Sequence, residues 1–93
     1  MVKDNPEQQR FELEAGGQLA IAEYRREPGL ITFVHTEVPG ALRGQGRGSE
    51  LARGALERVR QSGDKVVARC SFIAAFIRKN PEFRELLAAS NTL

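Results

Sequence analysis

The stretch Arg43-Gly44-Gln45-Gly46-Arg47-Gly48 decides the fold, because three alternate glycines stand directly before a segment with helical periodicity. In that segment, residues 48–62, apolar side chains recur on one stripe: Leu51, Ala52, Ala55, Leu56 and Val59. Glycines let a backbone approach a ligand closely, and the first amides of a helix carry partial positive charge. We therefore expect a phosphate-binding turn that presents the backbone amides of Gln45, Arg47, Gly48 and Ser49 to a pyrophosphate.

The chain before this turn reads as three short strands. Residues 10–14 form the first, since apolar side chains alternate at Phe11, Leu13 and Ala15. Gly16-Gly17 supplies a hairpin turn into a second strand at about 18–25. After a break at Glu27-Pro28-Gly29, residues 30–36 are rich in β-branched and aromatic side chains and read as a third, central strand. Short turns between antiparallel strands predict a meander.

The chain after the turn predicts a crossover connection. The helix at about 48–62 closes on Ser62-Gly63, and Lys65–Cys70 follows as a short apolar strand, which must lie parallel to the third strand. Two further helices are expected at 72–79 and 82–89, with Pro81 at the start of the second. The predicted fold class is therefore α/β (α+β), a compact, mixed and mostly antiparallel sheet with a β-α-β crossover and helices packed on it.

Length and composition set the remaining limits. At 93 residues the chain has room for one core, which we place in a single domain over residues 10–93, behind a flexible arm over residues 1–9. No apolar run approaches the roughly 20 residues of a membrane span, and the start lacks a signal peptide, so a cytoplasmic location is expected. Cys70 is the only cysteine, which excludes an internal disulfide and argues against bound metal.

Charge argues against a dedicated nucleic-acid binder, because 14 Lys and Arg face 12 Asp and Glu. Positive charge is nevertheless crowded around the glycine turn, where it could attract a nucleotide phosphate, at Arg43, Arg47, Arg53, Arg58 and Arg60. A solvated helix face explains Arg58 and Arg60 equally well. Two other phosphate loops do not fit: a P-loop needs a Gly-Lys pair, and a dinucleotide fold needs G-x-G-x-x-G early in a parallel sheet.

The pattern Arg43-x-x-Gly46-x-Gly48 resembles the Q/R-x-x-G-x-G/A signature of the GNAT superfamily of N-acyltransferases, in the place where that superfamily carries it. The resemblance extends to a short GNAT-like subfamily and covers roughly residues 10–88, because four blocks fall in order: His35-Thr36-Glu37-Val38-Pro39, Leu42-Arg43-Gly44-Gln45-Gly46, Cys70-Ser71-Phe72 and Asn80-Pro81-Glu82-Phe83. Arg47 departs from the pattern, since the superfamily usually has an aliphatic residue there. The side chain either lies exposed and adds charge near phosphates or only changes how the loop packs.

The resemblance implies acetyl-CoA as the coenzyme and an amine as the acceptor. It implies that residues 33–35 and 67–70 flank the thioester, and that the coenzyme is bound by Val34, Arg43, Gly44, Gln45, Gly46, Arg47, Gly48 and Ser49. His35, the only histidine, stands two residues before Glu37 and therefore on the same face of a strand, which suits a base assisted by a carboxylate or a polar strand end.

Cys70 follows the strand that faces the thioester, so its thiol either donates a proton or accepts the acetyl group, unless it is only a buried structural residue. The general acid of the superfamily is often a tyrosine, but Tyr24, the only one here, lies on an early strand and reads as a packing residue.

The acceptor site is expected to be open or borrowed, because Gly16-Gly17 replaces the helices that build it in larger members. A small amine, a protein amino terminus or a lysine of a partner would all reach it, and we expect a monomer or weak dimer without membrane or nucleic-acid partners. Two alternatives to a transferase stay open. One is a sensor or carrier that binds acetyl-CoA without turnover, and the other is an arginine-based adaptor for nucleic acid or protein.

Overall fold

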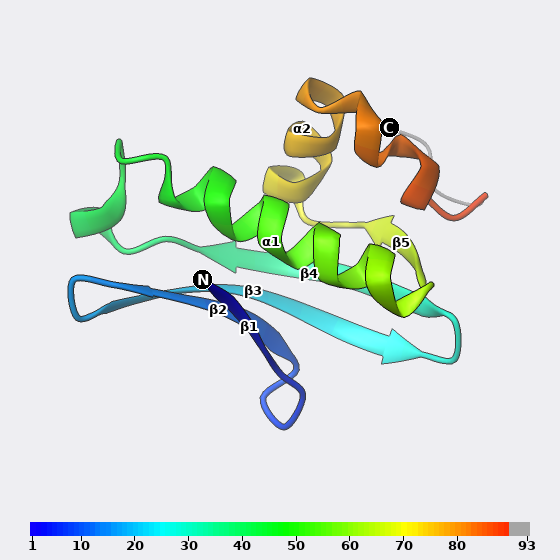
Figure 1. The fold of residues 1–93 in the computed structure, drawn as a ribbon, viewed down its shortest axis with the longest axis horizontal. Coiled ribbons are helices and arrows are strands. Elements are labelled where there is room, and N and C mark those ends of the chain that lie inside the picture. Colours follow the sequence, from blue (N-terminus) through cyan, green and yellow to red (C-terminus); the bar gives the residue numbers. More distant parts are fainter. Residues whose placement is uncertain (90–93) are drawn as a thin grey trace.

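Five strands form one sheet in the order β1-β2-β3-β4-β5 (Figure 1). The computed structural model describes residues 1–89, so the last four residues of the expected domain lie outside the described residues. The strands are β1 (Val2–Asn5), β2 (Arg10–Ala15), β3 (Gln18–Glu27), β4 (Leu30–Glu37) and β5 (Lys65–Ala68). Strands β1 to β4 are an antiparallel meander, whereas β5 pairs parallel to β4. The predicted mixed, mostly antiparallel sheet is confirmed.

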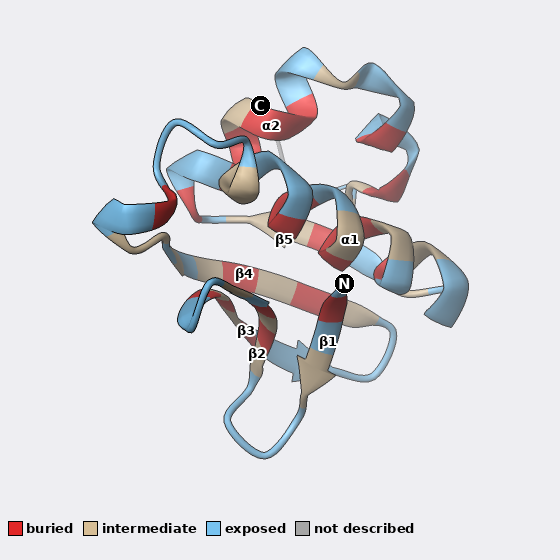
Figure 2. Cartoon of the chain, turned by 60° about the vertical axis from the view of Figure 1, so that its left-hand side comes forward, coloured by how far each residue is buried: buried red, intermediate tan, exposed pale blue. Residues whose placement is uncertain are grey.

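Helix α1 (Arg47–Ser62) makes the crossover between β4 and β5, and α2 (Ser71–Lys79) follows β5. The apolar stripe predicted for α1 is fully buried: Leu51, Ala52, Ala55, Leu56 and Val59. The helix ends where Gly63 adopts a φ of +80°, a conformation that glycine enters without a steric penalty. Figure 2 shows the buried residues gathered between the helices and the sheet, so the helices cover one face and leave the other to solvent.

Aromatic rings fill the centre of this core. The ring of Phe11 lies 5.1 Å from that of Tyr24 and 5.9 Å from that of Phe33, and all three side chains are buried. Tyr24 donates a hydrogen bond of 2.5 Å to Asp4 Oδ1, which satisfies the one polar atom of the ring. The prediction that Tyr24 is a packing residue is confirmed.

The expectation of a flexible arm is wrong for residues 2–5, which form the edge strand β1. Val2 pairs with Leu13 on β2, and its side chain is buried against α1. A Cβ atom at Gly54 would overlap Val2 Cγ2 and lie 2.6 Å from Val2 Cβ, so the glycine of the helix provides the space for the strand. Arg58 Nε also donates to Val2 O at 2.9 Å, which ties the same strand to α1.

The last expected helix differs as well. Residues after Asn80 form a 3-10 helix, η2 (Pro81–Leu86), in place of an α-helix over 82–89. Phe83 and Leu86 are buried, and Ala88 N donates to Val66 O on β5, so packing against the sheet edge ends the helix early. Strand β5 likewise stops at Ala68 rather than at Cys70, which becomes the residue before α2.

A bulge in β4 changes the direction of its side chains. Tyr24 of β3 pairs with Phe33, but its neighbour Glu23 pairs with His35, so Val34 has no residue opposite it. Phe33 points to the helix side, and after the extra residue Thr36 takes that direction, opposite the buried Ala22. The side chains of His35 and Glu37 therefore point to the solvent-facing side of the sheet.

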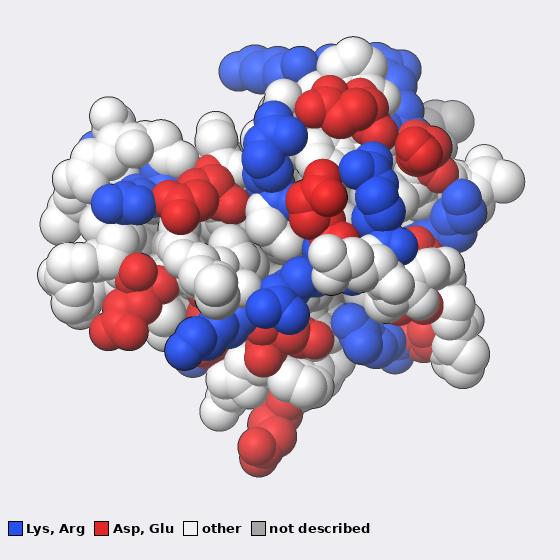
Figure 3. All heavy atoms as spheres, in the orientation of Figure 1, with Lys and Arg blue, Asp and Glu red and all other residues white. Residues whose placement is uncertain are grey.

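Charges of both signs are interspersed over the surface of α1 (Figure 3). Glutamates lie beside three of the five crowded arginines, in the pairs Arg47–Glu50, Arg53–Glu82 and Arg60–Glu57. The crowded arginines therefore do not make the concentrated positive patch that their spacing predicts. Arg60 is half-buried over the ring of Phe83 and donates to Glu82 O at 2.8 Å, so the interpretation of Arg60 as part of a solvated helix face is wrong. Within residues 1–89, no helix combines the length and apolar character needed to cross a membrane.

Candidate active site

The glycine turn has the backbone conformation that its sequence predicts. Gly44 and Gly46 have φ values of +80° and +75°, which side chains rarely allow, and a Cβ atom at either position would meet no atom within 4 Å. A short 3-10 helix, η1 (Gly40–Leu42), precedes the turn and anchors it through the buried side chain of Leu42. Gln45 lies exposed, and its side-chain amide donates to Ala41 O at 2.9 Å. The backbone amide of Gln45 already donates to Leu42 O at 3.4 Å, so the expectation that it faces a pyrophosphate is not supported. The turn leaves open space at Gly44 and Gly46.

Helix α1 begins directly after Gly46, with Arg47 as its first residue. Gly46 has no side chain with which to cap the helix, and no side-chain cap is found at this end among the described residues. The first amides of a helix have no carbonyl partner within the helix, so those of Arg47, Gly48 and Ser49 stay available. These amides are a suitable cradle for an anion such as phosphate.

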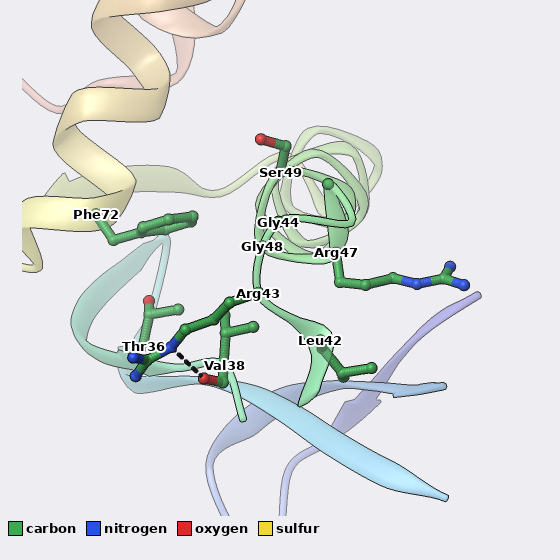
Figure 4. Close-up of a pocket in the computed structure, with 10 residues that line it drawn as sticks. Thr36, Val38, Leu42, Arg43, Gly44, Arg47, Gly48, Ser49 and Phe72 are labelled. Carbon is green, nitrogen blue, oxygen red and sulfur yellow. Dashed lines mark hydrogen bonds between the residues drawn. The ribbon is translucent and has the colours of Figure 1, made fainter. Parts of the chain in front are cut away.

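A cavity of about 400 Å³ lies beside this cradle and is here called the loop pocket. Its wall combines the glycine turn, the end of β4 and the start of α2, through Thr36, Val38, Arg43, Gly44, Gly48 and Phe72 (Figure 4). Gly48 allows the close approach of Phe72, because a Cβ atom there would lie 2.8 Å from Phe72 Cζ and 3.4 Å from Val38 Cγ2. The ring of Phe72 is 38% exposed, so the pocket has an aromatic wall open to a ligand.

Cys70 lies where β4 and β5 separate. Phe33 and Ala68 are the last paired residues of these strands, followed by one hydrogen bond of 3.0 Å from Arg69 N to Phe33 O. Beyond that point, Thr36 Oγ1 and Cys70 Sγ share a hydrogen bond of 3.1 Å. The thiol is buried at the start of α2, and the threonine lines the loop pocket, so the hydroxyl group connects the pocket with the thiol.

A second cavity, of about 630 Å³, lies on the solvent-facing side of the sheet and is here called the sheet-face pocket. It is lined by residues that include Leu19, Ile21, His35, Glu37, Pro39 and Arg43. His35 Nε2 lies 3.1 Å from Glu37 Oε2, which confirms that the two side chains share a face. Both are exposed, so the pair meets solvent directly. Thr36, Val38 and Arg43 line both pockets, which therefore adjoin across the end of β4.

The sequence-predicted residues thus fall into two groups. Gly44, Gly46, Gly48 and Ser49 line the loop pocket, His35 and Glu37 line the sheet-face pocket on the opposite face of β4, and Arg43 lines both. Gln45 and Cys70 line neither of these two pockets. Val34 is the bulged residue between these faces. Arg47 Nη1 pairs with Glu50 at 2.9 Å, and Figure 4 shows its side chain directed away from Phe72 and Thr36, so its charge does not enter the loop pocket.

Sequence reasoning missed Thr36 and Phe72 as residues of the site. Both stand inside quoted blocks, Thr36 directly after His35 and Phe72 two residues after Cys70, but Phe72 reads as one more apolar residue of a helical stripe. Thr36 follows a histidine on the opposite face, and only the bulge at Val34 directs it toward the thiol. A bulge leaves no mark in a period-two pattern, so no signal in the single sequence identifies this contact.

A sheet with one parallel crossover and a glycine turn that opens a helix together define a GNAT-like fold. A family profile described as GCN5-related N-acetyl-transferase matches residues 10–86. The chain belongs to this family, which is the GNAT family that the glycine turn resembles. The fold agrees with the NMR solution structure of a GCN5-like protein from Staphylococcus aureus, with a TM-score of 0.71 and 26% identity over 95% of this chain and 87% of that one.

Curated relatives include the proteins named NATD1 from Bos taurus and Homo sapiens. Each is 36% identical to this chain over 52 residues, a match that covers 56% of this chain and 46% of the relative. The match thus spans about half the length of these relatives.

Proposed function

We propose that this protein is an N-acetyltransferase that moves an acetyl group from acetyl-CoA to an amine. The observation that carries the proposal is the continuity from the glycine turn, through the loop pocket, to the Thr36–Cys70 hydrogen bond. One end of this path suits phosphates and the other suits a thioester. Family membership over residues 10–86 supports the same reaction class.

The residues present fit the coenzyme. The available amides of residues 47–49 and the open space at Gly44 and Gly46 suit its pyrophosphate. The exposed ring of Phe72 suits the pantetheine arm, and the bulge at Val34 frees backbone groups near the separation of the strands. When bound, acetyl-CoA supplies an acetyl carbon activated as a thioester, and the new C–N bond forms there while the C–S bond breaks.

Two proton transfers would then be carried out by residues of this chain, one from the acceptor amine and one to the leaving sulfur. His35 accepts the proton that the acceptor amine loses, and Glu37, 3.1 Å from the imidazole, stabilises the charge that forms. Cys70 lies on the other face of β4, where its thiol donates a proton to the leaving sulfur, while Thr36 Oγ1 fixes the position of the Cys70 sulfur. In the alternative covalent route, Cys70 itself takes the acetyl group before the amine does.

A coenzyme-binding module with little turnover is the second candidate, and the state of Tyr24 favours it. Burial, together with the hydrogen bond to Asp4, raises the pKa of Tyr24 to about 12, and the side chain is locked inside the core. The chain therefore has no tyrosine at the site to serve as general acid. If Cys70 is also inert, the protein binds the coenzyme without transferring its acetyl group.

A transfer assay separates the two candidates. The purified protein is incubated with acetyl-CoA labelled in the acetyl group and a mixture of small amines, and mass spectrometry follows labelled products. We expect N-acetylated amines at a rate above the protein-free control. Saturable coenzyme binding without any labelled amine would instead support the module, and label on Cys70 of a trapped protein would support the covalent route.

A further inference from the structure

We propose that the side chain of Arg43 binds a carboxylate of the acceptor, so that the acceptor is an apolar amino acid or a short peptide with a free carboxylate. This inference rests on the proposed transferase function. It concerns the sheet-face pocket and the guanidinium group of Arg43, whereas the proposed phosphate cradle consists of the backbone amides of residues 47–49.

The direction of the Arg43 side chain is the first observation. Its Nε donates to Val38 O at 3.2 Å, so the side chain runs back along β4 (Figure 4). It points toward Thr36 and away from the first turn of α1, where phosphates would bind. The guanidinium group therefore lies where the two pockets adjoin, beside the place where acetyl group and acceptor would meet.

The charge of Arg43 is the second observation. Three arginines line the two pockets, and two of them are already paired: Arg10 Nε lies 2.7 Å from Glu12, and Arg47 Nη1 lies 2.9 Å from Glu50. Arg43 has no carboxylate partner within residues 1–89. Its Nε is fixed on a backbone carbonyl, which leaves the two terminal nitrogens as a planar fork suited to a carboxylate.

The other residues that line the sheet-face pocket are complementary to the amine and the apolar side chain of an amino acid. Glu37 and His35 offer a negative and a basic group for the amine, while Arg43 offers a positive group for the carboxylate. Leu19, Ile21, Val38 and Pro39 supply apolar surface in the same cavity. A volume of about 630 Å³ accommodates a molecule of amino-acid or short-peptide size. The pocket thus complements both charges and the apolar body of such an acceptor.

Three amines with the same apolar body test the inference: leucine, leucinamide and 3-methylbutylamine. In the Arg43→Gln variant, kcat/KM for leucine should fall about tenfold or more further than the values for leucinamide and 3-methylbutylamine, whose change measures any effect of the substitution on the coenzyme side. Comparing each variant with the wild type for one amine cancels differences in amine basicity. Arg43→Lys keeps the charge but not the planar fork, so its kcat/KM for leucine should lie between those of the wild type and Arg43→Gln. The matched control is Arg25→Gln, an exposed arginine of β3 outside both pockets, and it should change nothing.

A binding measurement keeps the two proposals distinguishable. Titration of the ¹⁵N-labelled protein with N-acetylleucine should shift the Nε–H resonance of Arg43, whereas N-acetylleucinamide should not. A shift without transfer to any amine would support the carboxylate site and contradict the transferase. Transfer that does not depend on Arg43, or an Arg43→Gln variant that loses affinity for acetyl-CoA and not for leucine, would overturn the carboxylate site. The absence of both transfer and shift would overturn both proposals.

Discussion

Cys70 shows how much a single side chain depends on its neighbours. A lone buried cysteine is usually inert, but this one shares a hydrogen bond of 3.1 Å with Thr36, which lines the loop pocket. The threonine reaches the thiol only because Val34 is an extra residue in β4. The position of the sulfur is therefore set by a strand far from it in sequence.

Substitution of Cys70 tests whether this position serves catalysis. Cys70→Ala should leave the affinity for acetyl-CoA within about twofold of wild type and lower kcat by about a hundredfold, the usual effect of losing a proton donor. Cys70→Ser keeps a hydrogen-bonding group beside Thr36 and serves as the matched control for packing. Turnover equal to wild type in both variants would show that the thiol has only a structural role.

The elements before and after the glycine turn differ in how far the sequence predicts them. Strands β2 to β5, helix α1 and helix α2 follow from apolar periodicity and glycine breaks, with ends that differ by one or two residues. Strand β1 does not, because only Val2 of its four residues is apolar and its existence depends on pairing with β2 and packing on Gly54. The short η2 is missed because buried Phe83 and Leu86 decide its geometry.

For Gly54→Ala, the direction of the change in the free energy of unfolding tests whether β1 packs on α1. Alanine in the middle of a helix is ordinarily more stable than glycine by about 1 kcal/mol. Here the Cβ atom would overlap Val2, so Gly54→Ala should lower the free energy of unfolding, as measured by urea denaturation. Gly63→Ala is not a suitable control because its φ is positive, but Gln61→Ala on the exposed face of α1 is. A more stable Gly54→Ala variant would mean that residues 2–5 do not pack on α1.

The pairing of β1 with β2 should also weaken in acid. Hydrogen bonds from Arg10 first, and then from Asn5 on β1, hold the pKa of Glu12 below its usual value of 4.5. The folded protein consequently binds fewer protons than the unfolded chain, so this stabilisation is complete above about pH 4.5 and is lost as the pH falls through the lower folded pKa.

Glu12→Gln should therefore reduce the dependence of the unfolding free energy on pH below about pH 5, measured by urea denaturation at a series of pH values. Glu14→Gln is the matched control, because Glu14 lies on the same strand and makes no ion pair among the described side chains. An identical slope in wild type and Glu12→Gln would contradict the role of Glu12.

At the scale of the whole molecule, the fold and the glycine turn could be predicted from the sequence, but the full wall of the loop pocket and the division of the site between two faces could not. The glycine turn is local, so its residues and their backbone conformations follow from spacing. His35 and Cys70 lie on opposite faces of β4, and that separation arises from a bulge and from the point where β4 and β5 part. Neither the bulge nor the point of separation can be predicted from the local periodicity of the sequence.

Within residues 1–89, the helices lie on one side of the sheet (Figure 2). The sheet-face pocket lies on the other side. If this pocket is the acceptor site, as proposed above, the acceptor reaches it directly from solvent. This arrangement also explains how two substrates could approach β4 from opposite faces without competing for one entrance. The coenzyme side is the better defined of the two, because the glycine turn and α1 form it together.

Calorimetric titration with acetyl-CoA tests the central claim most directly, using Gly46→Asp and Gly63→Asp as a matched pair at the two ends of α1. Both glycines have positive φ and open space for a side chain, so the substitutions impose similar backbone strain. Only Gly46→Asp places a negative charge beside the proposed phosphate cradle. We predict one-to-one binding for wild type and Gly63→Asp and its loss in Gly46→Asp. Equal affinity in all three proteins, or no binding to wild type, would contradict the account.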